Sequence, residues 1–218
     1  MSPVSDQAHP LARLYYAHDP MCSWCWAFNP CWQQIQQRLP RTVEVVRLVG
    51  GLAADSSEPM PLEMQTYLQQ TWRQIQAQVP GSEFNYDFWR RCSPRRSTYP
   101  GCRAVIAARH QQAESAMTLA IQQAYYLHAR NPSDESTLVA LAQELGLDVS
   151  QFTRDLNAAL TRQTLLSEIE RCREMGAQGF PSLILEKQQQ RWLLALDYSD
   201  PEAALSQIER CMEAPGCP

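Results

Sequence analysis

Cys22 and Cys25 are separated by two residues, a spacing at which two thiols can interconvert with a disulfide. Apolar side chains follow Cys25 at helical intervals, at Phe28, Trp32 and Ile35, which predicts a helix that buries Cys25. A helix N-terminus carries unsatisfied N–H groups and a partial positive charge, so it stabilises a thiolate. We therefore predict an exposed, reactive Cys22 backed by a buried Cys25. Thiol–disulfide exchange requires that arrangement.

The same pair has two other interpretations, half of a structural zinc site or two inert buried thiols. A structural zinc site needs four ligands, usually from a second pair of cysteines or a closely spaced Cys/His pair. The sequence contains no such second pair, and neither Cys31 nor His18 has a usual spacing. We therefore favour redox chemistry and predict neither a metal site nor a tightly bound cofactor.

A strand, a helix and a second strand are predicted to position the pair. Residues 13–18 form a short β-prone run, and the helical pattern continues to Leu39 with Pro30 inside it. Residues 43–49 are rich in valine and predict a buried strand. Strand, helix and strand joined by short loops form a βαβ unit, whose strands are parallel.

The rest of the chain is predicted to be helical first and then to return to strands. The helical period holds from residue 61 to about 176, whereas 182–185 and 192–196 predict a β-hairpin around a polar stretch. A last helix starts near Pro201. We therefore predict an α/β fold with one mixed sheet, built from residues 1–60 and 177–218, and an all-helical insertion domain over 61–176.

Composition limits the location and partners of the protein. The chain has 218 residues and a net charge of −4, which argues against nucleic-acid binding. No apolar run approaches the ~18–20 residues of a membrane span, and residues 1–10 lack the features of a signal peptide. We therefore expect a cytoplasmic protein without a membrane partner, in which most of the eight cysteines are reduced.

Four motifs together resemble the DsbA-like thioredoxin superfamily, and most closely its cytosolic branch of predicted protein-disulfide isomerases related to FrnE. The resemblance covers nearly the whole chain and implies a thioredoxin-like fold interrupted by a helical insertion. The motifs are Asp19-Pro20-Met21-Cys22-Ser23-Trp24-Cys25-Trp26, Gly50-Gly51-Leu52, Cys102-Arg103-Ala104-Val105 and Gly179-Phe180-Pro181-Ser182.

The resemblance also implies roles for individual residues. Cys22 would be the nucleophile and Cys25 the resolving cysteine. Pro181 would be a cis-proline facing the cysteines, and Phe180 before it would offer backbone groups to an extended substrate peptide.

The residues between the cysteines depart from the pattern of DsbA. Ser23 and Trp24 stand where DsbA has Pro-His, so less positive charge stabilises the thiolate and we expect a less oxidising couple. Both residues are predicted to contact substrate. A helper carboxylate or histidine beneath the cysteines is common in the superfamily. His18 and Asp19 are near in sequence, but their direction is not evident from it.

The other six cysteines are interpreted as bystanders. Cys172 continues a helical stripe as a core residue, and Cys211 is expected to be a small buried residue near the end of the last helix. Cys92 and Cys102 lie in the insertion and could pair with each other, but we expect reduced thiols there. Cys31 lies off the stripe through Cys25, and Cys217 lies in the tail.

The function predicted from these residues is that of a thiol–disulfide oxidoreductase or isomerase, acting on cysteine-containing proteins or small disulfides. Glutathione could serve as a redox partner. One alternative is a glutathione-dependent isomerase or transferase of small molecules on the same fold, but that branch generally carries serine where Cys22 stands. The other is a non-catalytic module that binds a metal or a partner.

Overall fold

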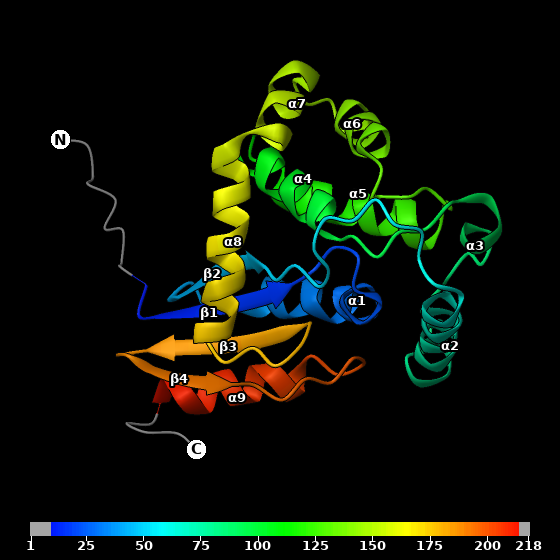
Figure 1. The fold of residues 1–218 in the computed structure, drawn as a ribbon. Helices are drawn as coiled ribbons and strands as arrows, with labels where there is room; N and C mark the ends of the chain where they lie inside the picture. The colour runs from blue at the N-terminus through cyan, green and yellow to red at the C-terminus, as the bar shows by residue number, and fades with distance from the viewer. Residues whose placement is uncertain (1–9, 214–218) are drawn as a thin grey trace.

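The computed structural model describes residues 10–213 and contains a four-stranded mixed sheet between helices (Figure 1). The strands are β1 (Ala12–His18), β2 (Val43–Val49), β3 (Ser182–Lys187) and β4 (Gln190–Leu193), in the order β2-β1-β3-β4. β1 is parallel to β2 and antiparallel to β3, and β3 is antiparallel to β4. The predicted mixed sheet is confirmed.

Helix α1 (Ser23–Arg38) connects β1 to β2 and completes the predicted βαβ unit, with Pro30 inside the helix. The two parallel strands are in register over their whole length, so that His18 lies beside Val49. The carboxyl ends of both strands therefore meet at one edge of the sheet. The N-terminus of α1, which carries the cysteines, follows the end of β1 after a short loop.

Helices cover both faces of the sheet. α1 and α9 (Glu202–Glu213) pack on one face, and α8 (Ala159–Glu174) crosses the other (Figure 1). Neighbouring residues of a strand point to opposite faces. Accordingly, Tyr16 lies in the cluster with α1 and α9, while Tyr15 lies in the cluster beneath α8.

The predicted helical segment lies between β2 and β3. Besides α8, its helices are α2 (Leu62–Gln78), α3 (Phe88–Arg91), α4 (Tyr99–Arg109), α5 (Glu114–Tyr126), α6 (Glu135–Glu144) and α7 (Val149–Asn157). The division of the chain into two domains stays a prediction.

No helix among residues 10–213 is long and apolar enough to cross a membrane.

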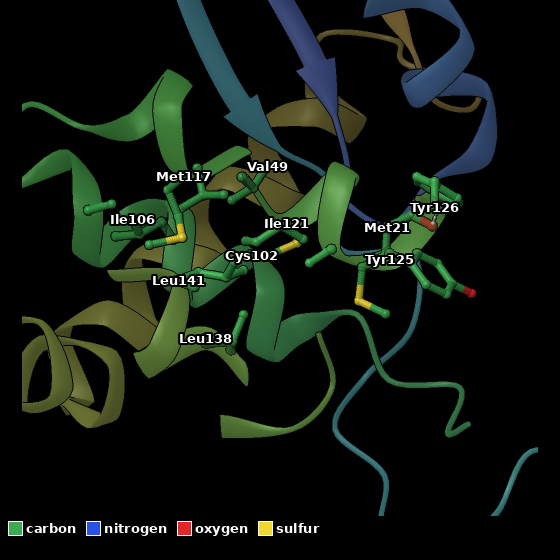
Figure 2. Packing of buried hydrophobic residues seen from close by; sticks show 14 of the residues in the cluster. Met21, Val49, Cys102, Ile106, Met117, Ile121, Tyr125, Tyr126, Leu138 and Leu141 are labelled. Carbon is green, nitrogen blue, oxygen red and sulfur yellow. Dashed lines mark hydrogen bonds between the residues drawn. The ribbon is translucent and has the colours of Figure 1, made fainter. Parts of the chain in front are cut away.

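The core of the helical segment extends to the loop that carries the cysteines. Figure 2 shows Met21 of that loop and Val49 of β2 in the same cluster as side chains of α4, α5 and α6. The hydroxyl of Tyr126 donates a hydrogen bond of 2.6 Å to the carbonyl of Met21. The helical segment thus holds the loop by both apolar packing and a buried hydrogen bond.

The C-terminal hairpin differs from its prediction. The expected strand over 192–196 begins earlier, because β4 already starts at Gln190, which pairs with Lys187. The turn therefore contains only Gln188 and Gln189, which adopt positive φ values of 49° and 68°. β4 is an edge strand, and its first two side chains, Gln190 and Arg191, are polar and exposed, so no apolar pattern marks its start.

Candidate active site

The two cysteines of the pair lie side by side at the start of α1. Cys22 is the N-cap residue, and its carbonyl accepts a hydrogen bond of 3.1 Å from the backbone N–H of Trp26. The backbone N–H of Cys22 in turn donates to the carbonyl of Asp19 at 3.0 Å. Cys25 lies in the first turn of α1, three residues after Cys22, and both thiols are free. The structure thus brings the predicted pair together.

Cys22 is less accessible than the sequence predicts. The expected exposed residue is only 7% exposed, and its thiol donates a hydrogen bond of 3.3 Å to the carbonyl of Phe180. The prediction of an open Cys22 is therefore wrong, because a loop 158 residues away along the chain covers the helix end. The Phe180–Pro181 peptide bond of that loop is cis, as the resemblance implied.

Cys25 is fully buried, as the helical stripe predicts. Burial raises the pKa of its thiol well above the ordinary value, and the neighbouring Cys22 sulfur raises it further. A protonated, enclosed thiol does not meet a substrate from solvent. Cys22 is consequently the sulfur of the pair that an external disulfide reaches first.

Asp19 is a fully buried carboxylate beside the pair, and sequence reasoning named it without placing it. Its Oδ1 accepts from the backbone N–H of Met21 at 2.8 Å. Its Oδ2 accepts from the N–H of Leu52 at 2.8 Å and from the hydroxyl of Thr98 at 2.7 Å. Burial raises the pKa of Asp19 despite these bonds, which lower it. Through them the carboxylate ties the cysteine loop to the ends of β2 and α4.

His18, the other helper candidate, lies inside the protein with 1% exposure. Its ring stacks on that of Tyr16 with centroids 4.8 Å apart, and neither ring nitrogen has a hydrogen-bond partner among the described residues. Burial, followed by the charges of Arg47 and Arg109, lowers the pKa of His18 to about 3. The imidazole is therefore neutral at physiological pH and supplies no positive charge to a thiolate.

A cavity of about 630 Å³ opens beside the cysteines, and Trp24, Phe180, Leu196 and Tyr198 are among the residues that line it. The rings of Trp24 and Tyr198 pack edge to face, with their centroids 5.2 Å apart. Trp24 thus lines this cavity, and its contact with substrate stays a prediction. Tyr198 was missed by sequence reasoning because the loop after β4 carries no motif. Burial raises the pKa of Tyr198, and the two cysteines raise it further.

Ser23 lies apart from this cavity, although it was predicted to contact substrate. The residue is 8% exposed, and its hydroxyl accepts a hydrogen bond of 3.1 Å from the indole N–H of Trp72. Trp72 is fully buried in the core of the helical segment. The hydroxyl of Ser23 therefore anchors the start of α1 to α2.

None of the other described cysteines joins the pair. Cys172 and Cys211 are buried, as predicted for core residues, and Cys92 and Cys102 are both free thiols. Cys31 is also buried, and burial raises the pKa of its thiol to about 11. Cys217 lies outside the described residues. Within the described part of the chain, no group of three or more His, Cys, Asp or Glu side chains could hold a metal ion.

Comparison with known families agrees with this geometry. A sequence model described as thioredoxin matches residues 15–192. The chain belongs to the thioredoxin family. The match includes the cysteine pair, the cis-proline and the whole helical segment, so this member of the thioredoxin family carries its helices inside the fold. The predicted thioredoxin-like fold with a helical insertion is confirmed.

Three known proteins are similar to this thioredoxin-family chain. A crystal structure from Nitrosomonas europaea, provisionally assigned as a protein disulfide isomerase, is 27% identical, with a TM-score of 0.81 over 94% of this chain and 99% of that chain. The cytosolic disulfide reductase DsbM from Pseudomonas aeruginosa is 24% identical, with a TM-score of 0.75 over 92% and 98% of the two chains, and it shows the shared fold.

The third relative is a longer protein. The ClpXP adapter protein SpxH from Halalkalibacterium halodurans is 27% identical over 178 residues, which are 79% of this chain and 58% of SpxH. This thioredoxin-family chain thus spans little more than half the length of that relative.

Proposed function

We propose that this protein is a thiol–disulfide oxidoreductase that exchanges two electrons between the Cys22–Cys25 pair and a substrate disulfide. The placement of an enclosed Cys25 one helical turn after a Cys22 at the helix N-terminus carries this proposal. The family membership supports it, and so do the names of the two structural relatives above.

Reduction of a substrate takes two exchange steps. The Cys22 thiolate attacks one sulfur of the substrate disulfide, the substrate S–S bond breaks, and the first substrate thiolate leaves and takes up a proton. Cys25 then loses its proton and attacks the sulfur of Cys22, which forms the Cys22–Cys25 disulfide and releases the second substrate thiol. The enzyme loses two electrons and the substrate gains them. The reverse sequence oxidises a substrate dithiol.

The surrounding groups support these steps. The N-terminus of α1 stabilises negative charge on Cys22 when its proton leaves. Once Cys22 has lost its proton, it no longer donates a hydrogen bond to the carbonyl of Phe180. That carbonyl becomes free to accept a hydrogen bond from a backbone N–H of an extended substrate. Asp19 positions the loop that holds both sulfurs.

We infer that the physiological direction is reduction or isomerisation in the cytosol, with cysteine-containing proteins as substrates. The glutathione pool keeps the cytosol reducing, which favours the reduced dithiol form of the enzyme and disfavours net oxidation of substrates. The name of DsbM, a cytosolic disulfide reductase that was also crystallised with GSH, supports this location and a thiol co-substrate. The presence of cysteine at position 22 counts against the glutathione-dependent isomerases and transferases, which generally carry serine there.

The test uses the purified protein and a peptide disulfide whose cleavage separates a fluorophore from its quencher. The reduced wild type should cleave it, Cys22→Ser should not, and Cys25→Ser should accumulate a mixed disulfide on Cys22. Cys92→Ser is the matched control, because this thiol donates to the carbonyl of Ala129 away from the pair and its loss should leave the rate unchanged. Equal rates for wild type and Cys22→Ser would overturn the proposal in favour of a partner-binding module, the type of role that the name of SpxH describes.

A further inference from the structure

One cavity opens beside the cysteine pair, and a second cavity along α1 adjoins it. The first is the cavity of about 630 Å³ that includes Phe180 in its lining. The second, of about 750 Å³, extends along α1 to Cys31. Both are lined by Val79, Tyr198 and Ser199, so they meet at these residues. We call the two cavities together the acidic cleft, after Glu83 and Asp197 in their lining.

The charged side chains that line this cleft are all acidic. They are Glu83, which follows α2, and Asp197, which precedes α9, and both are exposed. Backbone N–H groups of Ser199 and Asp200 donate to the carboxylate of Asp197 and hold its pKa below the ordinary value, so it is ionised at neutral pH. Among the described residues that line the two cavities, none is lysine, arginine or histidine.

This charge pattern disfavours anionic substrates. Oxidised glutathione carries four carboxylates and two ammonium groups, and its carboxylates would find acidic side chains and no cation in the lining. Two unit charges about 4 Å apart in water change an equilibrium by about fivefold. Each like-charged contact in this cleft therefore weakens binding by about that factor, and each opposite contact strengthens it equally.

The remaining lining suits a peptide chain. The second cavity presents neutral amide side chains, which pair with backbone N–H and C=O groups irrespective of sequence. They belong to Asn29, Gln33, Gln34 and Gln123. The two adjoining cavities, each within the range of a whole small-molecule pocket, offer more room than one small disulfide needs.

We propose that the acidic cleft binds an extended polypeptide segment with lysine or arginine near its reactive disulfide, and that it discriminates against glutathione disulfide. This inference rests on the proposed thiol–disulfide exchange and specifies its substrate class. The substrate sulfur meets Cys22 beneath the Phe180 carbonyl. The adjoining segment passes Tyr198 towards Cys31, and its basic side chains lie near Glu83 and Asp197.

The test compares three peptide disulfides that differ only in flanking residues, which are lysine, glutamine or glutamate, with glutathione disulfide as a fourth substrate. At low salt the second-order rate constant of enzyme oxidation should fall by about fivefold from lysine to glutamine and again from glutamine to glutamate. Glutathione disulfide should react no faster than the glutamate peptide. At about 1 M salt, where the screening length is about 3 Å, the differences should collapse.

Variants assign the effect to the cleft. Glu83→Gln and Asp197→Asn together should slow the lysine peptide by about fivefold, each single variant should give part of that loss, and all three should leave the glutamine peptide unchanged. Glu170→Gln is the matched control, since Glu170 is an exposed acid of α8 paired with Arg173 and should leave all rates unchanged. Equal rates for the three peptides, or a lysine preference that survives in the Glu83→Gln/Asp197→Asn double variant, would overturn the inference. Failure of the glutamine peptide to react at all would instead refute the proposed exchange activity.

Discussion

Substitution of phenylalanine for His18 removes a titratable group that lies inside the protein and stacks on Tyr16. The pKa of His18 is about 3 in the folded protein, against about 6.5 in an unfolded chain. Between these values the unfolded state binds a proton that the folded state does not. The free energy of unfolding of the wild type therefore falls as the pH falls through this window.

The size of the effect follows from the two pKa values. Each pH unit well inside the window lowers the free energy of unfolding by about 1.4 kcal/mol for this one group. Between pH 7 and pH 5, His18 accordingly accounts for a loss of about 2 kcal/mol. His18→Phe lacks this contribution. Any packing cost of the larger ring shifts its stability by the same amount at every pH.

Urea denaturation of both proteins at pH 7, 6 and 5 measures the effect. The difference in unfolding free energy between wild type and His18→Phe should move in favour of the variant by about 2 kcal/mol from pH 7 to pH 5. The slope with urea should be the same for both proteins, which shows that the same surface is exposed on unfolding. A stability difference that is independent of pH would refute the assignment of a depressed pKa to His18.

Three further predictions concern the supports of the site. A Cβ atom on Gly50 would lie 1.9 Å from the ring of Phe180, so Gly50→Ala should displace that ring and slow peptide-disulfide cleavage by about tenfold or more, measured as kcat/KM. Arg109→Met leaves the mostly buried Glu168 without its ion-pair partner and should cost about 3 kcal/mol in urea denaturation. Trp72→Ala empties a fully buried site and should cost about 3–5 kcal/mol in the same measurement.

The central elements of the fold could be predicted because each carries a local pattern. The valine-rich run of β2 and the apolar stripe of α1 gave their positions, and their short connections required parallel strands. β4 was displaced because an edge strand with exposed polar residues, such as Gln190 and Arg191, has no apolar alternation. Its pairing with β3 comes from backbone hydrogen bonds, which any side chain permits.

The site was predictable where chemistry is local and missed where it depends on distant contacts. The spacing of Cys22 and Cys25 identified the pair, and the helical period identified the buried member. The cover over Cys22 comes from Phe180, far along the chain, so the sequence around the pair gave no indication of it. The position of Asp19 just before the pair marked it as a candidate helper carboxylate. The direction in which its side chain points depends on hydrogen-bond donors at Leu52 and Thr98, which are distant in sequence.

The most direct test of the dithiol mechanism is a single-turnover reaction between reduced protein and one equivalent of the glutamine-flanked peptide disulfide, followed by intact-mass and peptide-mass analysis. The wild type should lose two hydrogen atoms as a Cys22–Cys25 disulfide forms, and Cys25→Ser should carry the peptide on Cys22. Both results follow from an outer sulfur that attacks and an enclosed one that resolves. Attachment of the peptide to Cys25 or Cys31, or recovery of the wild type with both thiols of the pair still reduced, would contradict it.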